Sequence, residues 1–293
     1  MNLGHRCGIL LSDHTSLKIG GPALFWLEPE DPDDILEAIS FAEKENKALA
    51  IIGGGSNILA QDKGFDGIVI NLGQGFDYIE REQDTILKVG SASPISRLVK
   101  DSLDLGLGGC EFLSGIPGSF GGALFMNAGV SDGKAREAIK DIVIDVDVID
   151  LRDKKKKTLK REDIDFSYRS SGLDGRCVLG ARIGLKKYNS RAILDRIDSY
   201  MKRREWIQRL GLPSAGSIFK NPDNTDTAGR LIEGCGLKGS RIGGAEISKI
   251  HANVIVNTGS ACSKDVMDLI ELAKRSVKER FGIELELELK VFL

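Results

Sequence analysis

The most informative part of this chain is one glycine-rich stretch: Gly115-Ile116-Pro117-Gly118-Ser119-Phe120-Gly121-Gly122-Ala123-Leu124-Phe125-Met126-Asn127-Ala128-Gly129. Glycine lets a backbone take positive φ angles and approach a bound group closely, while Pro117 fixes the path between two flexible points. Such a loop exposes successive N–H donors, which suits a pyrophosphate held by the main chain rather than by lysines. A tight surface connection would not need so many glycines beside Phe120 and Phe125. The stretch therefore predicts a ligand-binding loop.

A second glycine cluster follows a short apolar run. Residues 48–52 predict a buried strand that leads directly into Gly53-Gly54-Gly55-Ser56-Asn57. Bare N–H groups, a hydroxyl and an amide make this turn a candidate phosphate cradle. It does not fit the dinucleotide fingerprint, because no G-x-G-x-x-G leads into a helix, and it lacks the lysine–serine pair of a P-loop. Two such loops in the N-terminal half predict an extended ligand with a central diphosphate, a description that FAD suits.

The overall composition gives no reason to expect charged partners. The chain has 293 residues, with 41 lysines and arginines against 43 aspartates and glutamates and a net charge of −2. This balance does not favour nucleic acid or a membrane surface. No apolar run reaches the length of a membrane span, and residues 1–13 lack the charged start and apolar centre of a signal peptide. We therefore expect no membrane insertion and no obligate protein partner.

The cysteines and histidines indicate neither disulfides nor a metal site. The cysteines are odd in number, widely spaced and without a C-x-x-C pair: Cys7, Cys110, Cys177, Cys235 and Cys262. That pattern suits a reducing cytoplasm, which is the expected location. The three histidines, at positions 5, 14 and 251, form no ligand cluster with a cysteine pair, so we expect no bound metal.

The N-terminal two thirds predict mixed strands and helices. Asp31 and Pro32 form an N-cap and first helical residue, and an apolar stripe of helical spacing follows them. Apolar runs at 68–70 and 86–89 predict strands, and residues 96–105 predict a helix. Residues 142–151 predict a strand, with the four lysines at 154–157 as the solvated turn of a hairpin.

The C-terminal third predicts an α+β domain. We place a domain boundary at 186–191 and a charged amphipathic helix at 192–210. Apolar residues of helical spacing between 266 and 277 predict a second helix, which Gly282 ends. Apolar residues then alternate with charged residues over 283–291, which predicts a strand with one apolar and one charged face.

Three polar segments hold candidate chemistry. Ser217 has no histidine nearby to support a hydrolase triad, so it is a candidate proton donor, with a polar turn as the alternative. Lys220 and Asn221 follow it and suit phosphate or carboxylate oxygens. Arg169, within Tyr168-Arg169-Ser170-Ser171, has a planar fork that matches a carboxylate or enolate, unless it is a surface charge. The glutamates that alternate over residues 284–288 are equally ambiguous.

The ordered motifs resemble those of the UDP-N-acetylenolpyruvoylglucosamine reductase family. The resemblance spans nearly the whole chain and is carried by the segments above together with four more: Leu17-Lys18-Ile19-Gly20-Gly21-Pro22-Ala23, Ala228-Gly229-Arg230-Leu231-Ile232-Glu233, Gly236-Leu237-Lys238-Gly239 and His251-Ala252-Asn253. The uninterrupted tail is similar to the family's shorter type, which lacks an extra substrate-covering loop.

The resemblance implies both a fold and a reaction. The fold is α+β, with an FAD-binding region of the para-cresol methylhydroxylase type in subdomains 1–70 and 71–190, then an α+β substrate domain at 191–293. NADPH would reduce the flavin, and the flavin N5 would deliver hydride to UDP-N-acetylglucosamine enolpyruvate, giving UDP-N-acetylmuramate for peptidoglycan. NADPH and the UDP-sugar would use the same cleft in turn.

The resemblance also assigns residues. Ser217 matches the family's proton donor, while Arg169 and Glu288 match its enolate-stabilising pair. Tyr168, Lys220 and Asn221 would bind substrate. The FAD contacts would fall on the two glycine clusters: Gly53, Gly54, Gly55, Ser56, Asn57, Gly115, Gly118, Ser119, Gly121, Gly122 and Asn127.

Departures from the family pattern keep two alternatives open. The family continues Asn-Ala-Gly with Ala-Tyr-Gly, whereas residues 130–133 here are Val-Ser-Asp-Gly and lack the tyrosine. Glu286 is a neighbouring candidate for the role of Glu288. One alternative is a flavin oxidase or dehydrogenase that acts on another hydroxy acid. The other is a catalytically silent flavin- or nucleotide-binding relative.

Overall fold

A computed structural model describes residues 4–131, 136–205, 209–223 and 226–292. The chain divides into two compact units. The first unit comprises the chain through Arg6, Phe25–Gly54 and Gly67–Arg204, and the second comprises Cys7–Leu24, Gly55–Asp66 and the chain from Glu205 onward. The domain boundaries at 70 and 190 divide the chain along its sequence, and they stay a prediction.

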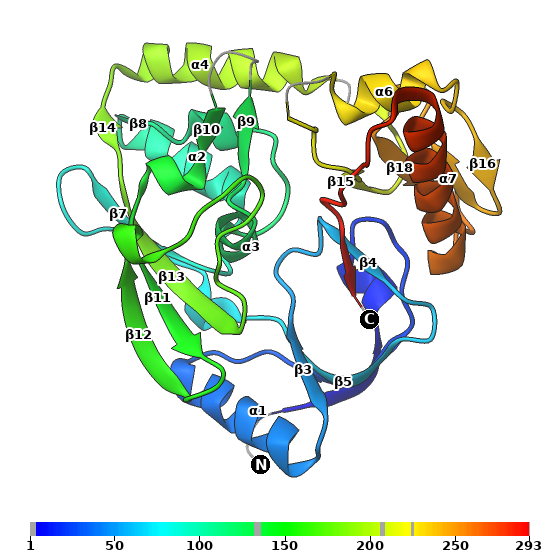
Figure 1. Ribbon diagram of the computed structural model, residues 1–293. Coiled ribbons are helices and arrows are strands. Elements are labelled where there is room, and N and C mark those ends of the chain that lie inside the picture. Colours follow the sequence, from blue (N-terminus) through cyan, green and yellow to red (C-terminus); the bar gives the residue numbers. More distant parts are fainter. Residues whose placement is uncertain (1–3, 132–135, 206–208, 224–225, 293) are drawn as a thin grey trace. The chain divides into compact units, whose positions relative to one another are not determined.

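The first unit is built on an antiparallel five-stranded sheet of order β12-β11-β13-β7-β6 (Figure 1). Its strands are β6 (Ile79–Arg81), β7 (Ile86–Gly90), β11 (Val143–Asp150), β12 (Lys155–Lys160) and β13 (Arg176–Gly184). The predicted hairpin is present as β11 and β12. The lysine run is not all turn, however, because β12 begins at Lys155 and places the following lysines along an exposed edge strand.

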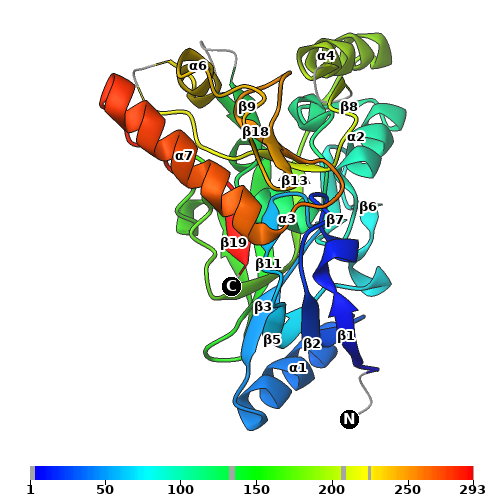
Figure 2. The same cartoon turned by 90° about the vertical axis from the view of Figure 1, so that its right-hand side faces the viewer.

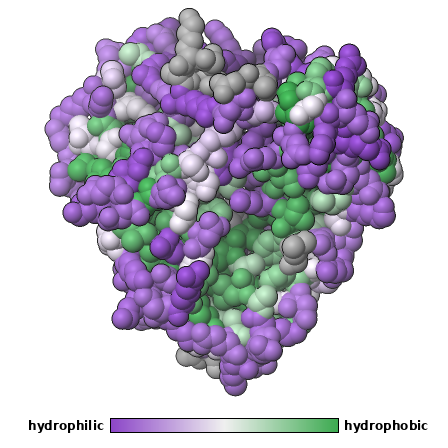
Figure 3. Space-filling view, in the orientation of Figure 1, coloured by the Kyte–Doolittle hydropathy of each residue, from purple (hydrophilic) through white to green (hydrophobic). Residues whose placement is uncertain are grey.

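Helices and short strands complete this unit: α2 (Ile95–Asp104), β8 (Leu107–Gly108), α3 (Phe120–Phe125), β9 (Gly129–Ser131), β10 (Arg136–Ala138), β14 (Lys186–Lys187) and α4 (Ser190–Arg203). Helix α3 packs on β7 and β13, and α4 lies over α2 and β8. Figure 3 shows mainly hydrophilic residues on the surface where α4 lies. The predicted helix at 96–105 is confirmed as α2. Within the helix predicted at 192–210, α4 ends at Arg203, Glu205 and Arg209 are again helical, and residues 206–208 lie outside the described part.

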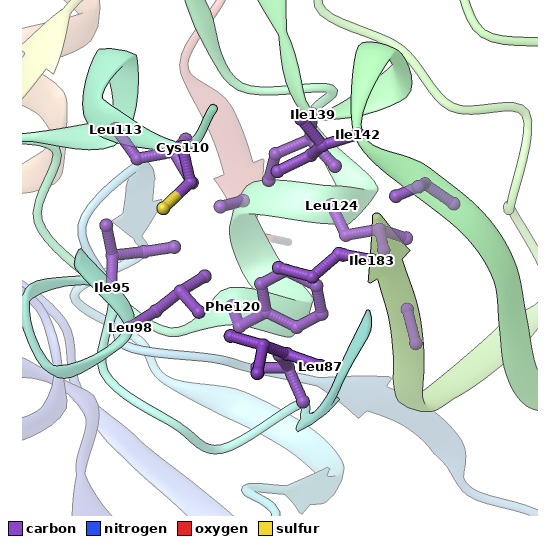
Figure 4. Close-up of a cluster of buried hydrophobic side chains, with 14 of the residues drawn as sticks. Leu87, Ile95, Leu98, Cys110, Leu113, Phe120, Leu124, Ile139, Ile142 and Ile183 are labelled. Atoms are coloured by element: carbon purple, nitrogen blue, oxygen red, sulfur yellow. The ribbon is translucent and has the colours of Figure 1, made fainter. Parts of the chain in front are cut away.

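The main core of the first unit surrounds Phe120, the first residue of α3. Its fully buried ring lies among Leu87, Leu98, Leu124 and Ile183 (Figure 4). Fully burying an aromatic side chain of this size stabilises a fold by about 1.5–3 kcal/mol. The apolar residues inside the glycine-rich stretch therefore anchor that loop to the sheet.

Local signals define helix α1 (Pro32–Lys44). The Asp31 side chain accepts hydrogen bonds from the N–H groups of Asp33 and Asp34, at 2.8 and 3.0 Å, as the sequence predicts. Its buried stripe joins a second core with residues of β5 (Phe65–Ile70), β11 and β13. Strand β3 (Ala48–Ile51) pairs in parallel with β5, and β2 (Pro22–Leu27) and β1 (Arg6–Leu10) complete a four-stranded sheet. The strand at β3 is confirmed, although its residues are only half-buried or exposed.

The second unit has its own sheet and core. Strands β15 (Ser214–Ser217), β18 (Val254–Asn257), β17 (Ala245–Ile247) and β16 (Arg241–Ile242) form an antiparallel sheet in that order. Helix α7 (Ser263–Phe281), the long orange helix in Figure 2, packs on β16 and β17 beside α6 (Ala228–Gly234). Helix α7 ends at Gly282, as predicted. None of the described helices has the length and apolar character that crossing a bilayer requires.

The last predicted strand is only partly correct. Strand β19 (Lys290–Phe292) pairs in parallel with β4 (Ile58–Ala60), but residues 283–289 form no strand. The alternation of burial is real, since Leu285 and Leu289 are buried and the glutamates between them are not. Among the described residues, this segment pairs only through an isolated bridge between Phe219 and Leu287 and has no continuous strand partner, so it forms an extended loop.

Candidate active site

The two predicted glycine loops meet within the first unit. A methyl group added at Gly54 would lie 2.6 Å from the Cα of Gly118, and one added at Gly53 would lie 2.5 Å from the Oγ of Ser119. Real Cβ atoms do not approach backbone this closely, so residue 54 must be glycine for the two loops to touch. Tertiary packing therefore unites two loops that lie more than sixty residues apart in sequence.

Their contact brings together a group of backbone donors that make no hydrogen bond to the described residues. Within the described part of the chain, the N–H groups of Gly53, Gly54, Gly118 and Ser119 donate no hydrogen bond. Adjacent backbone N–H groups of this kind form a concave anion site, and a diphosphate supplies the oxygens that would satisfy them. The arrangement fits the central diphosphate of FAD.

Hydrogen bonds with neighbouring residues hold the two glycine loops in place. The side-chain amide of Asn71 donates to the carbonyls of Ile52 and Gly53, at 2.8 and 3.1 Å. The N–H of Phe120 donates to the carbonyl of Ser93 at 2.8 Å, and that of Gly121 to the carbonyl of Ser91 at 2.9 Å. Sequence reasoning missed Asn71 and both serines, because nothing local marks them as partners of a glycine loop.

The rest of the first glycine cluster belongs to the second unit. The N–H of Ser16 donates to the carbonyl of Gly55 at 3.0 Å. The Asn57 side chain donates to the carbonyl of Glu288 at 3.1 Å, and the Lys290 N–H donates to the carbonyl of Asn57 at 3.1 Å. Asn57 thus fastens the C-terminal segment, and its predicted contact with FAD stays a prediction.

Asn127 also has a structural role in the first unit. Its side chain donates to the carbonyl of Ser167 at 2.7 Å, and its Oδ1 accepts from the N–H of Lys140 at 3.2 Å. Asn127 is buried and has a φ of +43°, a left-handed conformation that asparagine tolerates better than most residues. It therefore holds in place the chain that leads into the next candidate residues.

Tyr168 and Arg169 lie in a cluster of cations and one ring. The guanidinium of Arg169 lies 5.2 Å from the centre of the Tyr168 ring, and that of Arg136 lies 4.6 Å from it. Arg169 Nη1 also donates to the carbonyl of Gly129 at 3.2 Å. These contacts restrict the orientation of the Arg169 side chain. Sequence reasoning did not identify Arg136.

In the second unit, Ser217 and Glu288 belong to neighbouring segments. Ser217 ends β15, and the residue after it, Ile218, accepts hydrogen bonds at its carbonyl from the N–H groups of Glu288 and Leu289, at 2.8 and 3.2 Å. Ser217 is half-buried, and its hydroxyl makes no hydrogen bond to the described residues. The structure therefore brings together two of the three residues assigned to chemistry.

Lys220 and Asn221 continue the same segment. The Lys220 N–H donates to the carbonyl of Glu286 at 2.9 Å, and its ammonium lies 3.3 Å from a Glu286 carboxylate oxygen that faces solvent. Asn221 Oδ1 accepts from the N–H of Ala228 at 3.1 Å, at the start of α6. Asn253 is buried, and its side-chain amide forms hydrogen bonds with both the N–H and the carbonyl of Phe219. In the sequence it stands out only as part of the motif His251-Ala252-Asn253.

Two family models match the chain and define its class. The FAD binding domain matches residues 23–156. The C-terminal domain of UDP-N-acetylenolpyruvoylglucosamine reductase matches residues 208–292. The first match makes this chain an FAD-binding flavoprotein, and the backbone donors of the two glycine loops agree with it.

Individual relatives extend the likeness over the whole chain. It is 42% identical over 282 residues to the UDP-N-acetylenolpyruvoylglucosamine reductase of Desulforamulus reducens, covering 95% of this chain and 90% of the relative. The reductase of Thermotoga maritima is 40% identical over 284 residues, covering 96% of each. The crystal structure of the Thermus caldophilus reductase is 35% identical, covers 100% of both chains and has a TM-score of 0.84.

The chain belongs to the UDP-N-acetylenolpyruvoylglucosamine reductase family, and to its shorter type. It is accordingly an FAD-dependent oxidoreductase, a UDP-N-acetylmuramate dehydrogenase of peptidoglycan precursor synthesis. The predicted α+β fold and the predicted flavin are thereby confirmed.

Proposed function

We propose that this chain uses NADPH to reduce UDP-N-acetylglucosamine enolpyruvate to UDP-N-acetylmuramate. Bound FAD, once reduced, supplies the hydride. The protein must then hold the diphosphate of FAD, orient the enolpyruvyl group, stabilise the charge that develops next to its carboxylate, and deliver one proton. Each task has a candidate among residues whose contacts are described above.

Ser217 is the proposed proton donor to the α-carbon. Its hydroxyl makes no hydrogen bond to the described residues and is half-buried, so it can turn toward a substrate carbon. A well-placed acid contributes about 10²–10⁴-fold to a rate. The backbone bond between Glu288 and Ile218, at 2.8 Å, keeps Ser217 and Glu288 on adjacent segments. That juxtaposition is the observation that carries the proposal.

Arg169 and Glu288 are the proposed stabilisers of the enolate. Arg169 is oriented by Tyr168 and by the Gly129 carbonyl, and a preorganised cation stabilises developing charge without moving. Glu288 is half-buried, whereas the side chain of Glu286 is 76% exposed and pairs with Lys220, which favours Glu288 over its neighbour. Because Arg169 lies in one unit and the other two in the second, these roles are proposed residue by residue.

The binding roles follow the same division. The predicted FAD contacts lie in the two glycine loops, and Tyr168, Lys220 and Asn221 are the proposed substrate contacts. We propose the division into FAD subdomains 1–70 and 71–190 and a substrate domain 191–293, and a cytoplasmic location. All five cysteines lie among the described residues and are free, as a reducing compartment requires.

An anaerobic half-reaction tests the function directly. The bound flavin is reduced with NADPH, UDP-N-acetylglucosamine enolpyruvate is added, and flavin absorbance is followed. Prompt reoxidation is the expected result. A flavin that is reduced but stays reduced would reject this substrate, and would favour a flavoenzyme acting on another hydroxy acid or a silent relative.

A further inference from the structure

Strand β10 carries Glu137, a half-buried acid that the assigned roles leave unused. The hydroxyl of Tyr200 in α4 donates a hydrogen bond to one oxygen of its carboxylate, and Arg196 Nη2 donates to the other at 3.2 Å. Burial first, and then the hydrogen bond with Glu137, raise the pKa of Tyr200 above its ordinary 10.0, so this phenol stays a donor at neutral pH. Two donors on one helix therefore fix the carboxylate of Glu137.

The same arginine extends the network to the segment that precedes the glycine-rich stretch. Arg196 Nη2 also lies 3.7 Å from Oε2 of Glu111, a buried residue that begins the short helix η3 (Glu111–Leu113). That oxygen accepts from the N–H of Gly109 at 2.8 Å. Because Arg196 has this second carboxylate, removal of Glu137 does not leave its charge without a counterion.

The β9–β10 pair contacts two residues that have proposed roles in the reaction. In β10, the guanidinium of Arg136 lies 4.6 Å from the centre of the Tyr168 ring. In β9, the carbonyl of Gly129 accepts from Arg169 Nη1 at 3.2 Å. Successive side chains of a strand point to opposite faces, so α4 holds Glu137 on one face while its neighbour contacts Tyr168 on the other.

The backbones of β9 and β10 lie in direct contact at this point. Glu137 pairs with Val130 and Ala138 pairs with Gly129 in antiparallel register. A methyl group added at Gly129 would lie 2.1 Å from the carbonyl oxygen of Glu137 and 2.7 Å from the Cα of Ala138. A displacement of Glu137 would therefore also move the Gly129 carbonyl, which accepts the hydrogen bond from Arg169.

We propose that Glu137 is a positioning residue for Arg169 and Tyr168. Helix α4 fixes its carboxylate through Tyr200 and Arg196, and the paired backbones carry that position from β10 to β9. All of these residues lie in the first unit. The inference rests on the proposed roles of Arg169 and Tyr168 and gives Glu137 no contact with the substrate.

A double-mutant cycle tests whether Glu137 acts through Arg169. Glu137→Ala should slow reoxidation of the reduced flavin by the enolpyruvyl substrate about 10- to 100-fold, because misplacing a catalytic group by about 1 Å costs about 10²-fold. In an Arg169→Gln background, the same change should have little further effect. Glu162→Gln, which removes an exposed acid of the same unit, is the control. Additive losses, or normal reoxidation in Glu137→Ala, would overturn the proposal.

Two conservative variants separate positioning from folding. Glu137→Gln keeps an acceptor for one of the two donors of α4 and should retain part of the rate. Tyr200→Phe removes only one donor and should cause a smaller loss than Glu137→Ala. Flavin content and Tm are measured for each variant. A rate that falls only in proportion to lost flavin would assign Glu137 to folding alone and overturn its positioning role.

Amide hydrogen exchange tests the same position without turnover. The N–H groups of Ser167 and Ser170 donate to each other's carbonyls, at 2.9 and 3.2 Å, on either side of the two positioned residues. In Glu137→Ala, exchange should become faster in β9 and at residues 167–171 and stay unchanged in β11 and β13. Unchanged exchange at 167–171 would contradict the proposal. If wild-type enzyme fails the half-reaction test, the proposed function fails, and exchange still decides whether Glu137 positions this segment.

Discussion

At the scale of the residue, Ser217 owes its position to the glycine before it. Gly216 has a φ of +72°, and the pairing of β15 with β18 shifts register between Ser214 and Ser217. Such a bulge re-aims the side chain that follows it, and bulges of this kind are common next to active sites. A regular strand would have fixed the direction of residue 217 by simple alternation.

Replacing this serine separates the two half-reactions. In Ser217→Ala, reduction of the flavin by NADPH should be unchanged, while reoxidation by the enolpyruvyl substrate should slow by about 10²–10⁴-fold. Stopped-flow absorbance measures both steps. Ser214→Ala, a change in the same strand, is the matched control. Normal reoxidation in Ser217→Ala would remove this residue from the mechanism.

The contact between the glycine loops gives a second prediction. In Gly54→Ala, the new methyl would meet the Cα of Gly118 at 2.6 Å and the nitrogen of Ser119 at 3.0 Å, so the loops must separate. We expect a loss of about 1–3 kcal/mol in the free energy of unfolding and weaker retention of FAD. Urea unfolding and flavin content measure the two effects.

The control for this change is Gly4→Ala, because nothing lies within 4 Å of a methyl at residue 4. Wild-type stability together with full flavin content in Gly54→Ala would show that the loops do not need this close contact.

At the scale of the element, a single buried amide holds the segment after β15. Asn253 Nδ2 donates to the carbonyl of Phe219 at 2.8 Å, while its Oδ1 accepts from the Phe219 N–H at 2.9 Å. Phe219 lies outside any strand, so no ladder supplies these bonds. The side chain replaces a neighbouring strand for one residue and fixes the segment that carries Lys220.

Removing the amide should therefore be costly. Asn253→Ala leaves the buried N–H and carbonyl of Phe219 unpaired, and we expect a loss of about 2–4 kcal/mol in the free energy of unfolding. Asn189→Ala removes an exposed side chain that caps α4 and should cost about 1 kcal/mol. Denaturant unfolding of both variants compares the two losses. Equal losses would argue against a special role for Asn253.

At the scale of the whole molecule, His251 links stability to pH. Burial first, and then the charge of Lys238, lower its pKa from the ordinary 6.5, while the charge of Glu233 opposes them. The unfolded chain therefore binds a proton near pH 6.5, where the folded chain does not. Protonation favours unfolding, and stability falls as pH decreases below 6.5, levelling off below the lower pKa of the folded state.

This dependence is measurable as a difference between variants. The free energy of unfolding, measured between pH 5 and pH 7.5, should fall less toward acid in His251→Gln than in the wild type. His5→Gln is the control, because residue 5 is exposed. An identical pH profile for wild type and His251→Gln would exclude His251 as the titrating group.

Much of this architecture was predictable because its signals are local. Asp31 with Pro32 marks the start of α1, and the apolar stripe with Gly282 marks the end of α7. These features depend on residues within a few positions of one another. The prediction of a strand over residues 283–289 was wrong. Apolar and charged residues do alternate there, but alternating burial does not by itself provide a hydrogen-bonded partner strand.

The sequence alone determined the class of this protein: two glycine loops that suit a diphosphate, a serine suited to donate a proton, and a family likeness carried by ordered motifs. Tertiary structure alone decided that the backbone of Gly54 lies against that of Gly118 and that the side-chain amide of Asn253 binds Phe219. The physical reason is separation along the chain. A backbone donor or a guanidinium acquires its partners only when folding brings distant residues together, and no local pattern records that contact.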